Sequence, residues 1–334
     1  MNTFRGLLAF ATALLPFLPP SFAGDTISLN KNVNIAKVRV GYLPMVSSLA
    51  YFVATYNHYF VDEKLDVDAN YSKTSDTLAQ DLVSNNIDVV IELSIVPLLQ
   101  TLDSSGSAKF RIFSVSRIDA SNGFDGVLVK GSSTATDLSG LSSRRVAVFP
   151  GTTARDTFAA VFSAQYPSLR LPQFDNTIRP SDQLNALLRG DIDAIHAYEP
   201  FLTVGQKRFG FKRLYGSIYA AQLTPNPIGV AAVSESFIAT NRDATTRFLR
   251  AMNRAVEYIR SHPDESRDIL SKYTHADSDV ARDMAIMPMS LTYEIDKANL
   301  NRYLELLHNM NQYRFRVQAD RICLDDELAE RTGK

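Results

Sequence analysis

The decapeptide Leu82-Val-Ser-Asn-Asn-Ile-Asp-Val-Val-Ile91 returns in altered form as Leu187-Leu-Arg-Gly-Asp-Ile-Asp-Ala-Ile-His196, 105 residues later. Each copy has the pattern of a helix end, a polar turn, and an apolar strand that begins with Ile-Asp. The spacing is too long for the repeat of a solenoid and indicates two similar lobes. The two copies therefore predict a chain in which one α/β unit occurs twice.

Strand and helix patterns alternate around both copies. Because the order is β-α-β-α-β, we expect mostly parallel sheets with helices on both faces. From Ser236 onward the pattern is nearly all helical, and we expect this part to pack on the first lobe. An apolar stripe from Leu49 to Phe60 indicates a first helix, which we expect Asn57-His58 to close, because asparagine tolerates the left-handed conformation. The expected strands are 37–43, 65–71, 87–93, 109–115, 126–130 and 145–149, and the other expected helices include 76–84, 153–165 and 200–209.

Residues 1–23 have the three parts of a signal peptide. Arg5 precedes a short apolar run, and Ser21-Phe22-Ala23 ends it with small residues at the −3 and −1 positions. A buried N-terminal helix is the alternative, but Pro16 argues against it, and the run is too short to span a membrane. Residue 24 is glycine, so the cysteine of a bacterial lipoprotein is absent. We expect a soluble protein exported to the periplasm.

Composition excludes several function classes. The formal net charge of −1 gives no nucleic-acid or membrane signature. Cys323 is the only cysteine, so no intrachain disulfide can form, and the five histidines show no close pairing. We therefore expect no metal and no cofactor. About 310 residues remain after residue 23, more than one hydrophobic core usually supports, which again favours two lobes.

Candidate site residues follow from the sheet prediction. Ligands of open parallel sheets bind beyond the carboxyl ends of the strands, and four predicted ends carry small or polar residues. Asn226 adds a polar group beside the second crossing between the lobes. The predicted ligand-binding residues are Ser47, Ser48, Ser94, Ile95, Gly151, Thr152, Thr153, Tyr198, Glu199 and Asn226.

Two of these positions allow opposite interpretations. Gly151-Thr152-Thr153 leads directly into a helix, whose free amides favour an anion, and Arg155 could add charge. The same threonines could simply cap the helix. Glu199 could face a ligand, or it could be a first-turn acid of the following helix. His196 is interpreted as a core histidine.

Catalytic patterns are missing from the sequence. It contains no G-x-S-x-G elbow, no H-E-x-x-H, no Walker loop and no G-x-G-x-x-G. The single cysteine lies in the helical C-terminal part, far from any predicted strand end. We expect no catalytic residue and predict that the protein is not an enzyme.

Six segments occur in an order and spacing that carry a family resemblance: Val38–Pro44, Ala50–Phe60, Leu82–Val90, Thr136–Gly140, Val146–Thr152 and Leu187–Phe201. Together they resemble the periplasmic solute-binding proteins of ABC importers for aliphatic sulfonates, taurine, nitrate and thiamine-precursor pyrimidines. The resemblance implies a type II periplasmic-binding-protein fold, with residues 36–128 and 225–334 in one lobe, 129–224 in the other, and two hinge crossings. It also implies a monomer that binds a small molecule and delivers it to a membrane permease with a cytoplasmic ATPase.

The ligand class is left open by departures from that family. Sulfonate and nitrate binders often have tryptophan beside the acid before Pro-Phe, whereas this chain has Tyr198 there and no tryptophan. An anionic or zwitterionic, sulfonate-like molecule is the first expectation. The alternative ligands are a pyrimidine or thiamine precursor and an aromatic acid. The alternative functions are a sensory protein that reports its ligand to a membrane receptor, and an enzyme similar to the chorismate-dehydrating enzymes of the same fold.

Overall fold

The computed structural model describes residues 35–334, except residues 73, 275 and 333–334. The predicted signal peptide, residues 1–23, lies outside these described residues. Within the described part of the chain, no helix combines the length and the apolar character that a membrane span requires.

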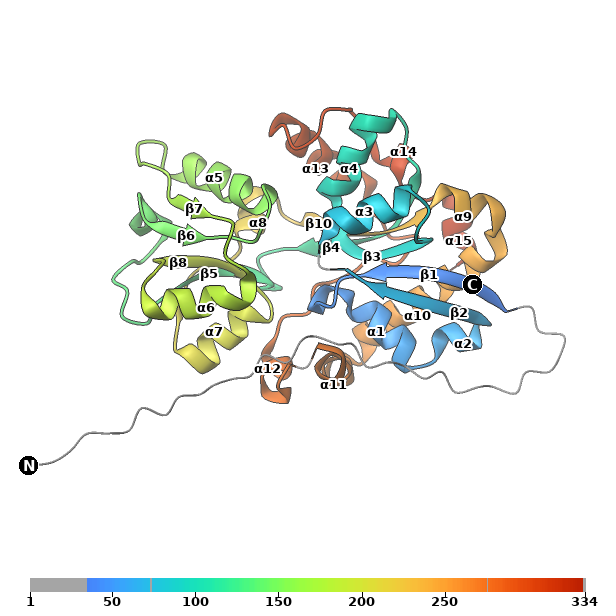
Figure 1. The fold of residues 1–334 in the computed structure, drawn as a ribbon, viewed down its shortest axis with the longest axis horizontal. Helices are drawn as coiled ribbons and strands as arrows, with labels where there is room; N and C mark the ends of the chain where they lie inside the picture. The colour runs from blue at the N-terminus through green and yellow to red at the C-terminus, as the bar shows by residue number, and fades with distance from the viewer. Residues whose placement is uncertain (1–34, 73, 275, 333–334) are drawn as a thin grey trace, which may run out of the picture. The chain divides into compact units, whose positions relative to one another are not determined.

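The first sheet has the strand order β2-β1-β3-β10-β4 (Figure 1). Strand β1 runs parallel to β2 and β3, whereas β10 runs antiparallel to β3 and β4. Helices α1 and α10 cover one face, and α3, α4 and α13 cover the other. The bounds are β1 Ala36–Tyr42, β2 Leu65–Tyr71, β3 Val89–Ser94, β4 Phe110–Ile118, β10 Asn226–Ser234, α1 Leu49–Tyr56, α10 Arg242–Ser261, α3 Ser75–Val83, α4 Ile95–Ser105 and α13 Lys297–Asn309.

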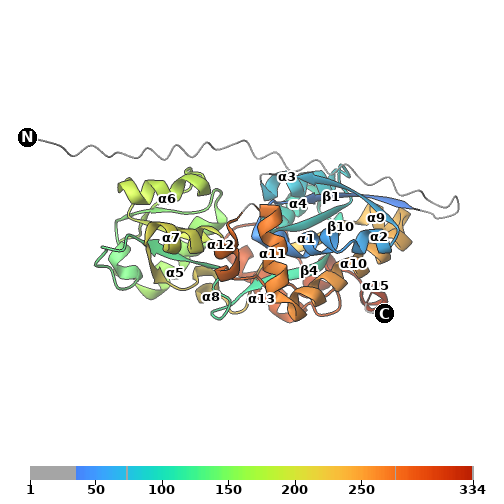
Figure 2. The same ribbon diagram turned by 90° about the horizontal axis from the view of Figure 1, so that it is seen from below.

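The second sheet has the equivalent order, β7-β6-β8-β5-β9. Strands β6, β7 and β8 are parallel, and β5 is antiparallel to β8 and β9. Helices α5 and α8 pack on one face, and α6 and α7 pack on the other (Figure 2). The bounds are β5 Asp125–Val129, β6 Arg145–Ala147, β7 Gln173–Asp175, β8 Ala194–Tyr198, β9 Lys212–Tyr215, α5 Thr153–Gln165, α6 Pro180–Arg189, α7 Phe201–Phe209 and α8 Ile218–Gln222.

The repeated Ile-Asp pair has a structural role at the start of β3 and β8. The N–H of Arg39 donates to Oδ2 of Asp88 at 2.8 Å, and the N–H of Asp88 donates to the carbonyl of Arg39 at 2.8 Å. Arg145 and Asp193 exchange the same two hydrogen bonds in the second sheet, each at 2.8 Å. Each aspartate therefore closes the amino end of its central strand pair. Together with the matching strand orders, these contacts support the prediction of one unit used twice.

Two sequence expectations differ from the structure. The first lobe was expected to extend through residue 128, but β5 pairs with β8 and so belongs to the second sheet from Asp125 onward. The second expectation was that Asn57-His58 closes the first helix, with asparagine tolerating the left-handed conformation. These two residues do follow the last residue of α1, but the left-handed one is His58, with φ 59°, while φ of Asn57 is −87°. His58 is also the N-cap residue of α2 (Tyr59–Asp62), so the left-handed residue joins the two short helices.

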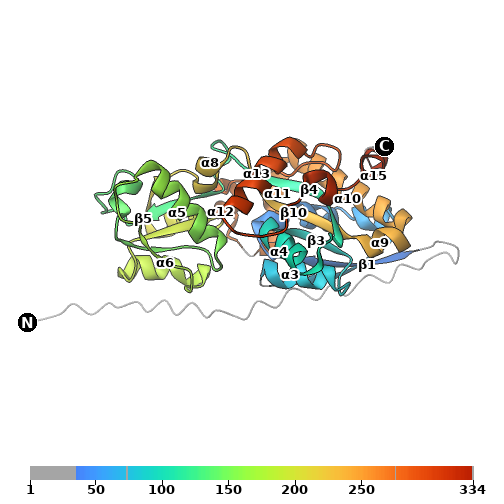
Figure 3. The same cartoon turned by 90° about the horizontal axis from the view of Figure 1, so that it is seen from above.

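The C-terminal part is helical and packs on the first sheet, as expected (Figure 3). The ring of Phe248 on α10 stacks on that of Phe60, with centroids 5.1 Å apart. Residues 288–290 run beside β4, where Ser116 forms a bridge with Met289. The remaining helices are α9 Glu235–Thr240, α11 Pro263–Thr274, α12 Ser278–Asp283, α14 Ala319–Ile322 and α15 Asp326–Arg331, with 3-10 turns η1 Val46–Ser48 and η2 Leu138–Leu141.

Candidate functional site

The predicted residues of the first lobe lie at the carboxyl ends of β1 and β3. Ser47 and Ser48 form η1, and the buried Ser48 hydroxyl donates to the carbonyl of Leu43 at 2.6 Å. Ile95 is fully buried in the core between the sheet and α4, so its side chain serves packing. Ser94 is half-buried at the start of α4, and its side chain makes no capping hydrogen bond. Of these four, Ser47 and Ser94 keep the most accessible side chains.

Tyr198 ends β8 and is engaged by two aromatic neighbours. Its hydroxyl lies 2.8 Å from that of Tyr219, and the two groups form a hydrogen bond. Its ring meets that of Phe149 edge to face, with centroids 5.4 Å apart. Tyr198 is half-buried, and its ring offers an apolar surface for contact with another molecule. Phe149 was not predicted, although it immediately precedes the predicted Pro150-Gly151 turn.

The Glu199 carboxylate caps the helix that follows it. Its oxygens accept hydrogen bonds from the N–H of Thr203 at 3.2 Å and the hydroxyl of Thr203 at 2.9 Å. A third donor, the N–H of Ala285, lies 3.4 Å away in the segment after α12. Burial raises the pKa of Glu199, although the hydrogen bonds from Thr203 oppose the increase. The capping interpretation thus has direct structural support, and a ligand contact by Glu199 stays a prediction.

Gly151 and Thr152 precede α5, and Thr153 is its first residue. The Thr152 side chain does not cap the amino end of this helix. Gly151 has φ 105°, a conformation that favours glycine, and its carbonyl accepts a hydrogen bond from Nδ2 of Asn176 at 2.8 Å. Thr152 occupies the N-cap position, is exposed, and makes no side-chain capping hydrogen bond. The first amides of a helix have no intrahelical acceptor, so this uncapped end can receive one from a bound molecule.

Arg155 does not add free positive charge to this helix start. Its Nε donates to Oδ1 of Asp156 at 2.7 Å, so the arginine is already paired. The other oxygen of Asp156 accepts from Nε2 of Gln312 at 2.8 Å, which joins α5 to the segment after α13. The possible contribution of Arg155 to anion binding is therefore used to neutralise a first-turn acid. What remains for an anion is the helix dipole and the free amides.

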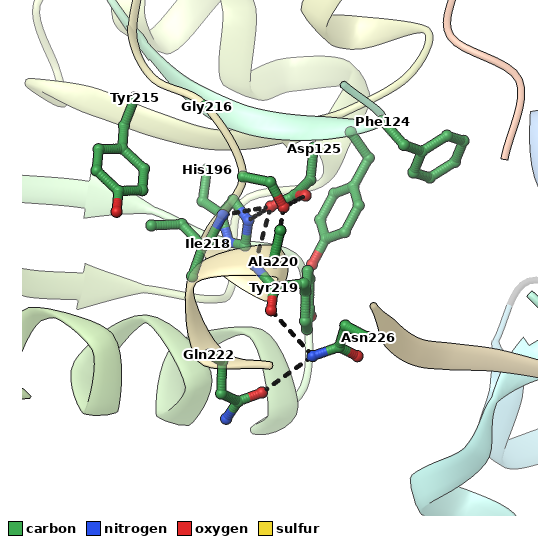
Figure 4. A network of polar contacts seen from close by, with 12 residues as sticks. Phe124, Asp125, His196, Tyr215, Gly216, Ile218, Tyr219, Ala220, Gln222 and Asn226 are labelled. Atoms are coloured by element: carbon green, nitrogen blue, oxygen red, sulfur yellow. Dashed lines mark hydrogen bonds and ion pairs between the residues drawn. The ribbon is translucent and has the colours of Figure 1, made fainter. Parts of the chain in front are cut away.

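Asn226 belongs to a buried network that sequence reasoning missed (Figure 4). At its centre, Oδ2 of Asp125 accepts from Ile218 N–H at 2.9 Å and lies 2.9 Å from Nε2 of His196. Ser217 also donates its hydroxyl to Asp125. Nδ2 of Asn226 donates to the carbonyl of Tyr219 at 3.1 Å. Both chain crossings between the sheets are thus tied together by hydrogen bonds.

Polar capacity is left over in this network. Within the described ranges, neither Nδ1 of His196 nor Oδ1 of Asn226 has a hydrogen-bond partner, although both atoms are buried. His196 lies in the core, as expected, with its ring among those of Phe158, Tyr198 and Tyr219. The signal that could have identified Asp125 is an acid directly before the apolar strand that starts at Gly126.

Glu92 is the other polar residue that was missed. It interrupts the apolar run of β3, lies 2% exposed, and accepts a hydrogen bond from the hydroxyl of Ser116 at 2.6 Å. Burial raises its pKa to about 8, against the opposing effect of Ser116. An acid inside an otherwise apolar strand is a visible sequence signal, because such a residue is seldom buried without a reason.

The described residues offer little for metal or thiol chemistry. In residues 35–332, leaving out the masked positions, no three His, Cys, Asp or Glu side chains are grouped so that they could hold a metal ion. Cys323 is buried, and burial raises the pKa of its thiol to about 12. A thiol in that state is protonated at neutral pH and is a weak nucleophile.

Comparison with known proteins identifies a matching family model and a curated relative. Residues 46–266 match the family model described as NMT1/THI5 like. Over 163 residues, 48% of the chain, the sequence is 27% identical to a protein of Bacillus subtilis (strain 168) named as an aliphatic sulfonates-binding protein. The match spans 47% of that relative, so about half of its length is covered.

Two solved structures illustrate the likeness of the fold. The periplasmic aliphatic sulphonate binding protein SsuA from Escherichia coli superposes with a TM-score of 0.69 at 14% identity, covering 86% of this chain and 92% of that one. The desulfurization enzyme DSZB gives a TM-score of 0.64 at 13% identity, covering 89% and 99%. At such identities the likeness shows the fold alone, and it confirms the predicted two-lobed periplasmic-binding-protein architecture.

Proposed function

Since this chain belongs to the NMT1/THI5-like family, we propose that it is an exported solute-binding protein for a small anionic or zwitterionic organic molecule, sulfonate-like in character. The ligand binds between the carboxyl ends of the two sheets, the position at which open α/β sheets receive ligands. The protein then delivers it to the membrane permease of an ABC importer. The B. subtilis relative named for aliphatic sulfonates supports this class of ligand.

The observation that carries the proposal is the uncapped start of α5. Thr152 makes no capping hydrogen bond, and Gly151 leaves room for an approaching molecule because nothing lies within 4 Å of the place of a Cβ. A sulfonate or carboxylate there accepts hydrogen bonds from helix amides and gains from the helix dipole. Because Arg155 is paired with Asp156, the groups that bind the anion in this proposal are the backbone amides at the start of α5 and the hydroxyl of Thr152. We call these groups the anion seat.

Replacing Thr152 with valine tests this seat. The variant keeps the shape of the side chain and removes the hydroxyl, so affinity for a sulfonate should fall about five- to thirtyfold. Isothermal titration calorimetry on residues 24–334, the chain after the predicted signal peptide, gives the dissociation constant. Thr246→Val on α10, whose hydroxyl donates to the carbonyl of Arg242, is the matched control and should bind like the parent.

The anion seat is rejected if Thr152→Val binds as tightly as the parent. A ligand that is cationic and carries no anionic group would reject it equally. The first step is a thermal-shift screen of sulfonates, nitrate, pyrimidines and aromatic acids, because it selects the compound for calorimetry. A pyrimidine or aromatic acid as the strongest hit would move the ligand class to the alternatives that the sequence left open.

An enzyme with this fold is the second candidate, favoured by the likeness to DSZB. Against a reaction with Cys323 as nucleophile stands the state of its thiol, which is buried and has a pKa raised to about 12. Mass spectrometry of each ligand after incubation with the purified protein separates the two functions. A ligand altered in amounts far above the amount of protein would establish turnover and overturn the binding proposal.

A further inference from the structure

Glu92 has an uncommon backbone conformation inside strand β3. Its φ is 51°, a left-handed conformation that is uncommon for residues other than glycine and asparagine. The pairing of β3 with β10 shifts register between Val230 and Ala232, so that two residues of β3, Ile91 and Glu92, face one residue of β10. Such bulges re-aim a side chain and are over-represented beside functional sites.

The neighbouring strand makes room for this side chain. A Cβ on Gly229 of β10 would lie 1.7 Å from Oε1 of Glu92 and 2.9 Å from its Cδ. Any residue other than glycine would therefore displace the carboxyl group. Gly229 pairs in register with Ser94, the predicted ligand residue at the end of β3. The carboxyl group of Glu92 thus lies against β10 at Gly229, the residue that pairs with Ser94.

The hydrogen bonds of Glu92 are incomplete. Oε2 accepts from the hydroxyl of Ser116, but in the described part of the chain no donor reaches Oε1. Oε1 therefore keeps its capacity to accept a hydrogen bond, and residues held in strained backbone conformations are concentrated at ligand sites. With its pKa raised to about 8 by burial, the carboxyl is largely neutral at pH 7, which lowers the cost of keeping it there.

From this geometry we infer that Glu92 is a ligand-contacting residue, whose Oε1 accepts a hydrogen bond from an amine or hydroxyl on the bound molecule. The inference rests on the proposed function, because it places the ligand at the carboxyl ends of the strands. It narrows the ligand class to molecules with two polar ends. The anionic end binds at the start of α5, and the donor end reaches β3.

Two isosteric probes test the donor end. 2-Aminoethanesulfonate and propanesulfonate have the same number of heavy atoms and the same anion, and differ by an amine in place of a methyl group. Calorimetry on residues 24–334 should give an affinity about ten- to a hundredfold higher for 2-aminoethanesulfonate than for propanesulfonate. In Glu92→Ala this ratio should fall to near one, and in Glu92→Gln, which keeps an acceptor oxygen, it should be intermediate.

Ser116→Ala separates ligand contact from a structural role. It removes the hydrogen bond between Ser116 and Glu92 but keeps the carboxyl group of Glu92, so the preference for the amine should survive. Equal binding of both probes by the parent overturns the inference while leaving the anion site intact. A Glu92 variant that loses both probes to the same extent also overturns it, because the residue then acts on stability alone. If neither probe binds the parent, the proposed sulfonate site itself fails, and this inference with it.

Discussion

Asp88 in the first sheet and Asp193 in the second accept the same backbone hydrogen bond, but their side-chain partners differ. The guanidinium of Arg39 donates twice to Asp88, at 2.6 and 3.1 Å, and Asp88 is largely buried. The guanidinium of Arg145 lies 4.0 Å from Asp193 and donates instead to the carbonyl of Gly190 at 2.9 Å. The backbone contact is therefore what both sheets need, and the ion pair is an addition in one of them.

The carboxyl ends of the same strands show the opposite relation. The place of Glu92 in β3 corresponds to Ala197 in β8, and Ser94 corresponds to Glu199. One sheet has a buried acid inside its strand and a hydroxyl at the end, and the other has a small apolar residue and then a capping acid. The amino ends thus share a backbone contact that serves the fold, whereas the carboxyl ends differ, and these are the ends at which we propose that the ligand binds.

The largest effect expected from this difference is on pH-dependent stability. Because burial raises the pKa of Glu92 from the ordinary 4.5 to about 8, the folded protein keeps a proton that the unfolded chain releases. The contribution of Glu92 to stability is thus fully present below pH 4.5 and is lost as pH rises towards 8. At about 1.4 kcal/mol for each pKa unit, the loss amounts to about 5 kcal/mol at most.

Urea unfolding at pH 5 and pH 8.5 measures this effect. Glu92→Gln cannot ionise. The difference between its free energy of unfolding and that of the parent should therefore shift in favour of the variant from pH 5 to pH 8.5. Ala197→Gln, at the equivalent place in β8, serves as the control and should follow the pH dependence of the parent. If the curves of the parent and Glu92→Gln stay parallel, Glu92 titrates normally, and its burial has been misjudged.

A smaller effect compares the two amino-end aspartates. Asp88→Ala removes a carboxylate that accepts three hydrogen bonds from Arg39 and should reduce the free energy of unfolding by about 2–3 kcal/mol. Asp193→Ala removes a more exposed partner and should cost about 1 kcal/mol or less. Denaturant titration of both variants at low and high salt gives the values. Equal losses would show that the backbone hydrogen bond alone accounts for both.

The architecture could be predicted from the sequence because both units contain the same recognisable pattern of apolar residues. The copies around Asp88 and Asp193 located both central strands, and the alternation of strands and helices identified the sheets. The first crossing was misplaced, since the strand that begins at Asp125 pairs with a strand about 70 residues later, and pairing of that kind leaves no local signal.

The site could be predicted only in part, because contacts decide which polar groups remain available. The strand ends were identified, yet Ser48 and Glu199 use their oxygens or hydroxyls within the protein, and Ile95 lies in the core. Sequence could not anticipate that Glu92 sits in a bulge opposite a glycine. That arrangement depends on Gly229, which joins the first sheet from a segment more than 130 residues away.

The central claim is that an anionic ligand binds at the open start of α5, between the carboxyl ends of the two sheets. A crystal structure of the protein with the strongest ligand from the thermal-shift screen tests it most directly. The account predicts sulfonate or carboxylate oxygens within about 3 Å of the amides of Thr153 and Ala154 and of the Thr152 hydroxyl. A ligand bound elsewhere, with these groups facing solvent, would contradict it.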